Sequence, residues 1–198
     1  MRLTIHEQIT LDGIAQANGG NNQDTDPGFT RGGWALPLGD AEGVAYILEA
    51  WRRPDAFLLG RRTYDLFASY WGSRTGDGGF GDAISSKPRY LVSNTVTDPR
   101  WAGTTVLAGD VAAAIRDLRA RPGGELLVVG SVALARWLLE QDLVDRLDLV
   151  QFPVLVGEGT PFFPLPGRDH ALKLETHRVF GTGVVAQTYR VGGRPEYA

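Results

Sequence analysis

The sequence alternates between two kinds of segment, and this alternation limits the possible folds more than any other feature. Short runs rich in Leu, Val, Ile and aromatic residues, many bounded by Gly, Pro, Asp or Asn, are typical of strands. Segments with apolar residues three and four positions apart lie between them and predict helices. The predicted strands are Leu3–Ile9, Ala56–Gly60, Arg89–Ser93, Glu125–Gly130, Leu147–Leu155 and Gly183–Val191. Such alternation predicts an α/β layer fold with a partly parallel sheet.

The predicted helices start at polar residues or at a strand end. Asp40 and Asp110 precede two apolar stripes, where they could cap the first turn. From residue 147 onward, strands follow without a helix between them, and Thr182-Gly183 is a hairpin signal. We therefore expect a mixed sheet with an antiparallel C-terminal part. The expected helices cover residues 44–51, 63–70, 111–118 and 134–143.

Length and composition narrow the class of protein. A chain of 198 residues with 43% hydrophobic residues can bury a sizeable core, and we expect one domain over residues 1–198. The absence of cysteine excludes disulfides, Cys-ligated zinc and a cysteine nucleophile. A net charge of −3 gives no broad attraction to nucleic acid or anionic lipid. With no secretory leader and no apolar run of ~20 residues, a cytoplasmic protein without a metal site is expected.

Three of the predicted strands end in groups that could bind an anion. Gly60 is followed by Arg61 and Arg62 at a helix start, where free N–H groups and forked guanidinium donors favour phosphate. The alternative is a pair of solvated arginines. Gly130-Ser131 ends another strand before a helix, as a binding turn or an ordinary capped turn.

The third strand end is Ser93-Asn94-Thr95, which could equally be a polar turn. Each of the three signals is weak alone, but ligands of α/β proteins bind beyond the carboxyl ends of the strands. Three such ends in one sheet would hold a dinucleotide with more than one phosphate. The sequence lacks the GxGxxG fingerprint of the conventional dinucleotide fold.

With these motifs in order, the chain resembles the dihydrofolate reductase-like superfamily, and within it the reductase domain of the bifunctional riboflavin-biosynthesis deaminase/reductase. The resemblance extends over nearly the whole chain. It is carried by Thr10-Leu-Asp-Gly13, Leu59-Gly-Arg-Arg-Thr-Tyr64, Tyr70-Trp71, Leu91-Val-Ser93, Val129-Gly-Ser131, Leu143-Val-Asp145 and Pro153-Val-Leu-Val-Gly-Glu-Gly159.

The resemblance implies a three-layer α/β/α fold, a mixed and mainly parallel sheet, a homodimer and NADPH as the cofactor. It implies hydride transfer to a small heterocyclic or carbonyl substrate, as in the reductase that acts on 5-amino-6-(5-phosphoribosylamino)uracil. The cofactor-binding positions that it implies are Ala15, Gln16, Leu59, Gly60, Arg61, Arg62, Thr63, Ser93, Asn94, Gly130, Ser131, Val132, Ala133 and Leu134.

The substrate side of the site is less defined. Dihydrofolate reductases carry an acidic residue on the first helix, and the gap-free match here is Val44. Asp12 is the first candidate for the acid or for orienting the substrate, with a turn as its alternative role; Asp40 is the second, with a helix cap as its alternative. Because the usual acid is missing, an NADPH-binding sensor without turnover is the rival function.

Two Gly-rich loops, Asn18–Gly39 and Gly72–Gly81, are long enough to be functional lids over the substrate. Trp34 and Trp71 lie in or at the ends of these loops and could stack on a flat substrate. Burial of both rings as core anchors is the alternative.

Overall fold

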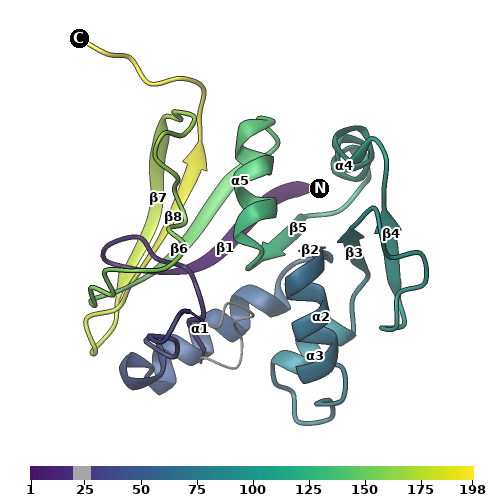
Figure 1. Ribbon diagram of the computed structural model, residues 1–198, viewed down its shortest axis with the longest axis horizontal. Helices are drawn as coiled ribbons and strands as arrows, with labels where there is room; N and C mark the ends of the chain where they lie inside the picture. Colours follow the sequence, from purple (N-terminus) through teal and green to yellow (C-terminus); the bar gives the residue numbers. More distant parts are fainter. Residues whose placement is uncertain (20–27) are drawn as a thin grey trace. The chain divides into compact units, whose positions relative to one another are not determined.

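The computed structural model describes residues 1–19 and 28–198, and it contains an eight-stranded sheet with helices packed on it (Figure 1). The strand order is β4-β3-β2-β5-β1-β6-β8-β7. The expected α/β class with antiparallel C-terminal strands is confirmed. The elements are β1 (Arg2–Thr10), η2 (Leu36–Leu38), α1 (Ala41–Arg52), β2 (Ala56–Gly60), α2 (Arg61–Tyr70), α3 (Phe80–Ser85), β3 (Arg89–Val92), β4 (Thr104–Leu107), α4 (Val111–Ala120), β5 (Glu125–Val129), α5 (Val132–Glu140), β6 (Arg146–Phe152), β7 (Leu172–Val179) and β8 (Val185–Val191).

The chain forms two compact units that interleave in the sequence. Unit 1 holds Met1–Ile5 and Tyr46–Asp145, and unit 2 holds His6–Ala45 and Arg146–Ala198. Strand β1 and helix α1 each contribute residues to both units. No single cut in the sequence therefore separates one unit from the other, which is compatible with the expected boundaries of 1–198. The number of domains stays a prediction.

The core of unit 1 follows the alternation of its parallel strands. On β2, Phe57 and Leu59 point into a cluster with Tyr64 of α2, Ile84 of α3 and Trp51 of α1. The side chain between them, that of Leu58, points to the opposite face because successive strand residues alternate. All three β2 side chains are fully buried. Apolar residues on both faces are typical of a parallel strand covered on both sides by helices.

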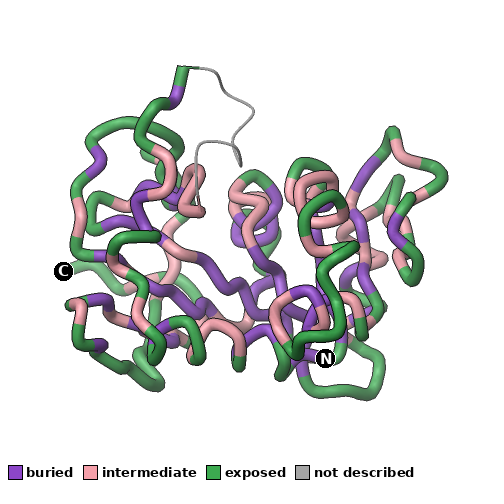
Figure 2. The backbone as a smooth tube through the Cα atoms, turned by 90° about the horizontal axis from the view of Figure 1, so that it is seen from below, coloured by how far each residue is buried: buried purple, intermediate pink, exposed green. Residues whose placement is uncertain are grey.

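Antiparallel strands make up the C-terminal part of unit 2. Strand β8 pairs with both β6 and β7, and the β7–β8 hairpin turns at Gly183, whose φ is +84°. The turn closes with a 2.9 Å bond from the N–H of Gly183 to the carbonyl of Phe180. This confirms the hairpin signal at Thr182-Gly183. In Figure 2 the C-terminal end of the trace is coloured mostly as exposed, in agreement with the exposure of residues 192–194 and 196–198.

Four elements had no expectation from the sequence: η2, α3, β4 and β7. Helix α3 begins inside the segment that was expected to be a lid, and Gly81 explains why the segment is compact. A Cβ on Gly81 would lie 1.6 Å from the carbonyl oxygen of Arg74, so the backbone approaches there as only glycine permits. Strand β6 ends at Phe152, because Pro153 follows it, rather than continuing to residue 155. Within the described part of the chain, no helix has both the length and the apolar character to cross a bilayer.

Candidate functional site

The three strand ends singled out in the sequence lie at one edge of the sheet in unit 1. Strand β2 pairs in parallel with β3 on one side and with β5 on the other. The carboxyl ends of the three strands are therefore neighbours. The groups that follow them, after Gly60, Val92 and Val129, come together as the sequence predicted.

A direct hydrogen bond joins two of these ends. The N–H of Gly60 donates to Ser131 Oγ over 2.9 Å. A Cβ on Gly60 would lie 2.9 Å from that Oγ and 3.1 Å from the Cβ of Ser131, so the turn after β2 fits against the turn after β5 only without a side chain. Gly130 and Ser131 both have a φ near +60°. This left-handed turn brings β5 directly into α5.

Two helices begin at this edge with their first N–H groups uncapped by a side chain. Gly60 precedes α2 and has no side chain to offer, and Ser131 precedes α5 but gives its Oγ to Gly60. Helix α4 shows the contrast, because Asp110 accepts a 3.0 Å bond from the N–H of Ala113. Uncapped helix starts carry partial positive charge and unsatisfied donors. Two neighbouring helix starts of this kind have donors that could hold an anion with several oxygens.

The two arginines of α2 supply full positive charge. Arg61 is about half exposed; its Nε lies 2.5 Å from Asp65 Oδ2, and its Nη1 lies 3.1 Å from Thr95 Oγ1. Arg62 is exposed, and within the described part of the chain it makes no hydrogen bond or ion pair. The sequence interpretation named Thr95 only as part of the third strand end and did not name Asp65, although the four-residue spacing from Arg61 to Asp65 is an ordinary helical pair. Of the two arginines, Arg62 therefore has the N–H donors that no neighbouring side chain already occupies.

Ser93 and Asn94 have local structural roles. Ser93 Oγ accepts from the N–H groups of Thr95 and Val96, both at 3.2 Å. Asn94 Oδ1 accepts from the N–H of Gly109 over 3.3 Å. The polar-turn alternative thus describes their present contacts, and these contacts hold the end of β3 in a fixed shape. Contact of either residue with a ligand stays a prediction.

The other expected cofactor positions divide between the two units. Leu59 is fully buried on β2, and Thr63 of α2 lies 3.4 Å from the place of a Cβ on Gly130. Val132, Ala133 and Leu134 form the first turn of α5. Ala15 and Gln16 belong to unit 2, where the N–H of Ala15 and the Oε1 of Gln16 both bond to Thr160. Their expected place over a nicotinamide ring stays a prediction.

Asp12 holds two segments of unit 2 together. Its carboxylate accepts from Thr10 Oγ1 at 2.5 Å, from the N–H of Gly157 at 2.7 Å and from the N–H of Val156. Partial burial pushes the pKa of Asp12 up, but the combined hydrogen bonds from Thr10, Gly157 and Val156 bring it below its ordinary value. This geometry favours the turn role over that of an acid that donates a proton at neutral pH.

The remaining candidates on the substrate side are also engaged. Asp40 Oδ1 caps α1 by accepting from the N–H of Gly43 over 2.7 Å. The indole of Trp34 is 8% exposed, and its Nε1 donates to the carbonyl of Gln16. Trp71 packs against the rings of Trp51 and Phe80. These contacts favour the capping and core-anchor alternatives, and stacking on a substrate stays a prediction. Residues 20–27 of the first Gly-rich loop lie outside the described residues.

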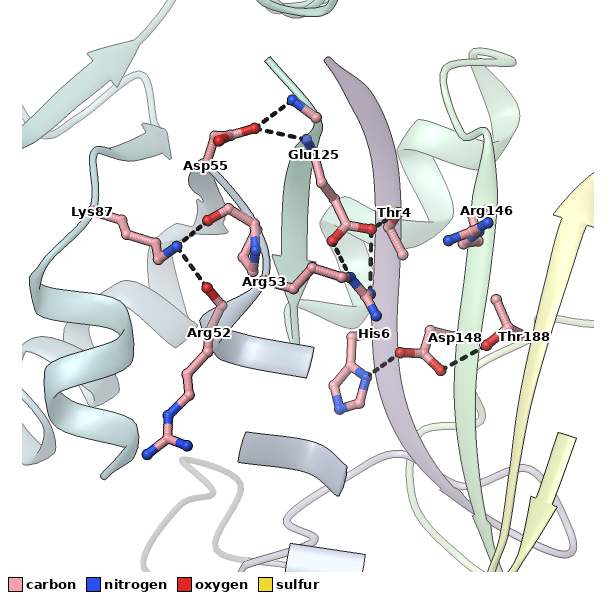
Figure 3. Close-up of polar contacts among 12 residues, drawn as sticks. Thr4, His6, Arg52, Arg53, Asp55, Lys87, Glu125, Arg146, Asp148 and Thr188 are labelled. Atoms are coloured by element: carbon pink, nitrogen blue, oxygen red, sulfur yellow. Dashed lines mark hydrogen bonds and ion pairs between the residues drawn. The ribbon is translucent and has the colours of Figure 1, made fainter. Parts of the chain in front are cut away.

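Two buried ionisable side chains that had no proposed role lie next to each other on β1 in unit 2. His6 Nδ1 is 3.0 Å from Asp148 Oδ2, and the other oxygen of Asp148 accepts from Thr188 (Figure 3). Glu7 is 5% exposed, and burial raises its pKa from 4.5 to about 8, although the N–H of Gln8 lowers it slightly. Among the described residues, His6 Nε2 and Glu7 Oε2 have no hydrogen-bond partner. The sequence shows only an alternating strand at these positions.

A surface hollow in unit 1 lies at the other end of the strands. Its lining includes Arg52, Asp82 and Lys87. The residues precede β2 and β3, whereas the candidate site follows these strands. Lys87 Nζ already bonds to the carbonyls of Arg52 and Pro54, and Arg52 bonds to that of Gly78. Because Arg52 and Lys87 already donate hydrogen bonds to backbone carbonyls, the hollow is a poor anion site.

Comparison with known proteins gives relatives along nearly the whole chain. The uncharacterized protein YyaP of Bacillus subtilis is 24% identical over 196 residues, which cover 97% of this chain and 96% of YyaP. A putative riboflavin biosynthesis protein from Shewanella sp. PV-4 superposes with a TM-score of 0.67 at 23% identity, covering 96% of this chain and 99% of that one.

Two further solved structures share the fold at lower identity. A pyrimidine reductase-like protein from Corynebacterium diphtheriae has a TM-score of 0.60 at 17% identity, covering 96% of this chain and 91% of that one. Dihydrofolate reductase from Enterococcus faecalis, in complex with NADP(H) and RAB-propyl, has a TM-score of 0.61 at 14% identity, with 96% of both chains covered. The fold is thus dihydrofolate reductase-like.

The family comparison covers more than the site. The family model described as the RibD C-terminal domain matches residues 2–186, which include the three strand ends and the whole of β1 and β6. Together with the structural likenesses, this match supports a reductase-like function. The chain belongs to the family of the RibD C-terminal domain.

Proposed function

We propose that this protein is an NADPH-dependent reductase of a small heterocyclic or carbonyl substrate. The observation that carries the proposal is the pair of uncapped helix starts, α2 and α5, beside Arg61 and Arg62. A dinucleotide has a pyrophosphate that suits such helix starts. The extra phosphate of NADPH suits an exposed guanidinium. The structural likeness to a reductase that binds NADP(H) supports the same cofactor.

The chemistry of the residues in unit 1 supports this assignment, because phosphate oxygens accept hydrogen bonds from backbone N–H groups at helix starts. The missing side chain of Gly60 and the left-handed turn at Gly130-Ser131 leave the first N–H groups of both helices open. Bound NADPH would supply the hydride. The protein's own residues would hold its phosphates, orient it and exclude water from the reacting atoms.

The cofactor assignment is tested by replacing each arginine with alanine. Arg61→Ala and Arg62→Ala are each expected to weaken NADPH binding by about 10- to 100-fold, since a charge-assisted contact contributes roughly 1.5–3 kcal/mol. NADH, which lacks the extra phosphate, is expected to lose less. Arg62→Ala should give the larger difference, because Arg61 already has Asp65 and Thr95 as partners. Calorimetric titration with both nucleotides measures these affinities.

Arg116→Ala is the matched control, because Arg116 is an exposed arginine of α4 and its loss changes the net charge equally. An equal loss of NADPH affinity in this control, or equal losses of NADPH and NADH in the α2 variants, would contradict the phosphate assignment. Turnover is tested by NADPH oxidation with pyrimidines, pterins and quinones. NADPH binding with silence across the panel would favour a sensor without turnover, since Asp12 and Asp40 both have structural contacts.

A further inference from the structure

The charges of helix α2 are distributed against the helix dipole. Arg61 and Arg62 are its first two residues, its first turn has no acidic residue, and Asp65 is the only carboxylate between residues 61 and 70. The dipole disfavours cations at the start of a helix, and an arginine four residues before an acid is the less favourable order for a helical ion pair. The stability of the helix alone therefore does not account for this arrangement, whereas an anion bound at the helix start would.

The guanidinium group of Arg61 is held from two directions. Its Nε lies 2.5 Å from Asp65 Oδ2, and its Nη1 donates to Thr95 Oγ1 over 3.1 Å. The side chains of Arg61 and Asp65 are 47% and 43% exposed. An ion pair this exposed is weak, so an anion from solution can compete with it. Any phosphate that reaches Arg61 therefore meets a carboxylate that already holds part of the guanidinium group.

The backbone around Asp65 is fixed by other bonds than those of its carboxylate. Arg100 Nη2 donates to the backbone carbonyl of Asp65 and to Ser69 Oγ, both over 2.7 Å. Thr95 contacts Arg61 from the turn after β3. The carboxylate of Asp65 can thus leave Arg61 without loss of the bonds that tie α2 to the segment after β3.

We propose that Asp65 sets the preference of the cofactor site between NADPH and NADH through its ion pair with Arg61. This inference rests on the proposed function. Without cofactor, the carboxylate balances the charge of the guanidinium group; with NADPH, the extra phosphate takes over that balance. The carboxylate and the phosphate have the same sign and share one cation, so Asp65 lowers the affinity for NADPH.

The effect falls on one nucleotide because only one carries the extra phosphate. A phosphate monoester has a charge of about −1.5 to −2 at neutral pH, so a nearby carboxylate acts on it strongly. The pyrophosphate is common to NADPH and NADH, and its repulsion cancels from the ratio of the two affinities. An ion pair that served only to stabilise α2 would leave that ratio unchanged. The ratio therefore distinguishes the two roles of Asp65.

The test is calorimetric titration of Asp65→Asn with NADPH and with NADH. Asparagine keeps an oxygen that can accept from Arg61 Nε but has no charge. The affinity for NADPH is expected to rise by about 3- to 10-fold and that for NADH to change by less than about twofold, because an exposed ion pair contributes modestly per unit charge. Asp117→Asn, which removes an exposed carboxylate from α4, is the matched control and should change neither affinity.

A double-mutant cycle separates an effect through Arg61 from a general effect of net charge. In the Arg61→Ala background, Asp65→Asn is expected to change the affinity for NADPH by less than about twofold. Melting of each variant without nucleotide shows whether α2 is intact. Asp65→Ser, a second neutral variant, gives the same comparison if asparagine lowers the melting temperature.

The outcomes separate this inference from the proposed function. An unmodified protein that binds neither nucleotide would overturn both. If the unmodified protein binds NADPH, three results would overturn the role of Asp65 alone: an unchanged affinity for NADPH in the neutral variants, equal gains for NADPH and NADH, or the same gain without Arg61. A gain confined to NADPH and dependent on Arg61 would support it.

Discussion

At the residue scale, burial in the fold moves the pKa of the Glu7 carboxyl group far above its ordinary value. A carboxyl group in a strand normally points to solvent, yet this one is buried and its pKa rises from 4.5 to about 8. Between these two values the folded protein keeps a proton that the unfolded chain has released. The stability of the fold therefore decreases as the pH rises through this window, and it levels off above the folded pKa.

Glu7→Gln tests this directly, because the amide has almost the same shape and never ionises. The unmodified protein is expected to lose about 1.4 kcal/mol of stability per pH unit from this group between roughly pH 5 and 8. Glu7→Gln should lose that slope and unfold at a higher temperature at pH 8. Thermal unfolding across the pH range measures both. Glu49→Gln, at an exposed glutamate, should follow the unmodified protein. Identical slopes in the unmodified protein, Glu7→Gln and Glu49→Gln would contradict the assignment of the pH dependence to the buried Glu7.

The residue scale also shows where sequence interpretation stops. Asp12 sits in a Leu-Asp-Gly motif that suggested chemistry, but its backbone hydrogen-bond donors beyond the neighbouring Thr10 hydroxyl come from Val156 and Gly157, 144 and 145 positions away. Nothing local to Asp12 indicates those donors. Gly60 and Ser131, in contrast, were identified because each ends a strand before a helix, a pattern that is visible within a few residues.

At the scale of elements, the turns after β2 and β5 are packed directly against each other through Gly60 and Ser131. In Gly60→Ala the new methyl group would overlap the side chain of Ser131, and strain of this kind costs about 1–3 kcal/mol. We expect a lower melting temperature and a smaller stabilisation by NADPH. Gly60→Ala combined with Ser131→Gly removes the overlapping atoms, and glycine also suits the positive φ at residue 131.

The double variant is therefore expected to be more stable than Gly60→Ala alone. Calorimetric melting of the two single variants and the double variant gives the coupling between the positions. Simple addition of the two single effects would mean that the turns are independent. Chemical denaturation of the same set checks that the order of stabilities does not depend on heating.

Elements with strong periodicity were predictable and those without it were not. The ends of β2 agree with the sequence because an apolar run meets a Gly-Arg-Arg helix start. Strand β7 had no such signal: Lys173, Glu175 and Arg178 interrupt its apolar residues, and the irregularity after Leu174 breaks the alternation. A strand that buries neither face within its own chain has little pressure toward a regular pattern.

At the scale of the whole molecule, the candidate phosphate groups all belong to unit 1, whereas Ala15 and Gln16 belong to unit 2. Hydrogen exchange with and without NADPH separates the two contributions. We expect slower exchange at residues 61–63 and 132–134, whose N–H groups would face the phosphates. Slower exchange at residues 13–17 as well would support the contact that the family resemblance implies; protection confined to residues 13–17 would contradict the phosphate site. NADH is the control for the extra phosphate.

The burial of Trp34 provides an optical probe of cooperativity. Of the five tryptophans, it is the only one in the sequence of unit 2, since Trp51, Trp71, Trp101 and Trp137 all fall in unit 1. The difference in fluorescence between the unmodified protein and Trp34→Phe therefore isolates the unfolding of unit 2, while the remaining emission follows unit 1. Coincident transitions would mean that a chain with interleaved units melts as a single cooperative body. Separate transitions would give each unit a melting temperature of its own.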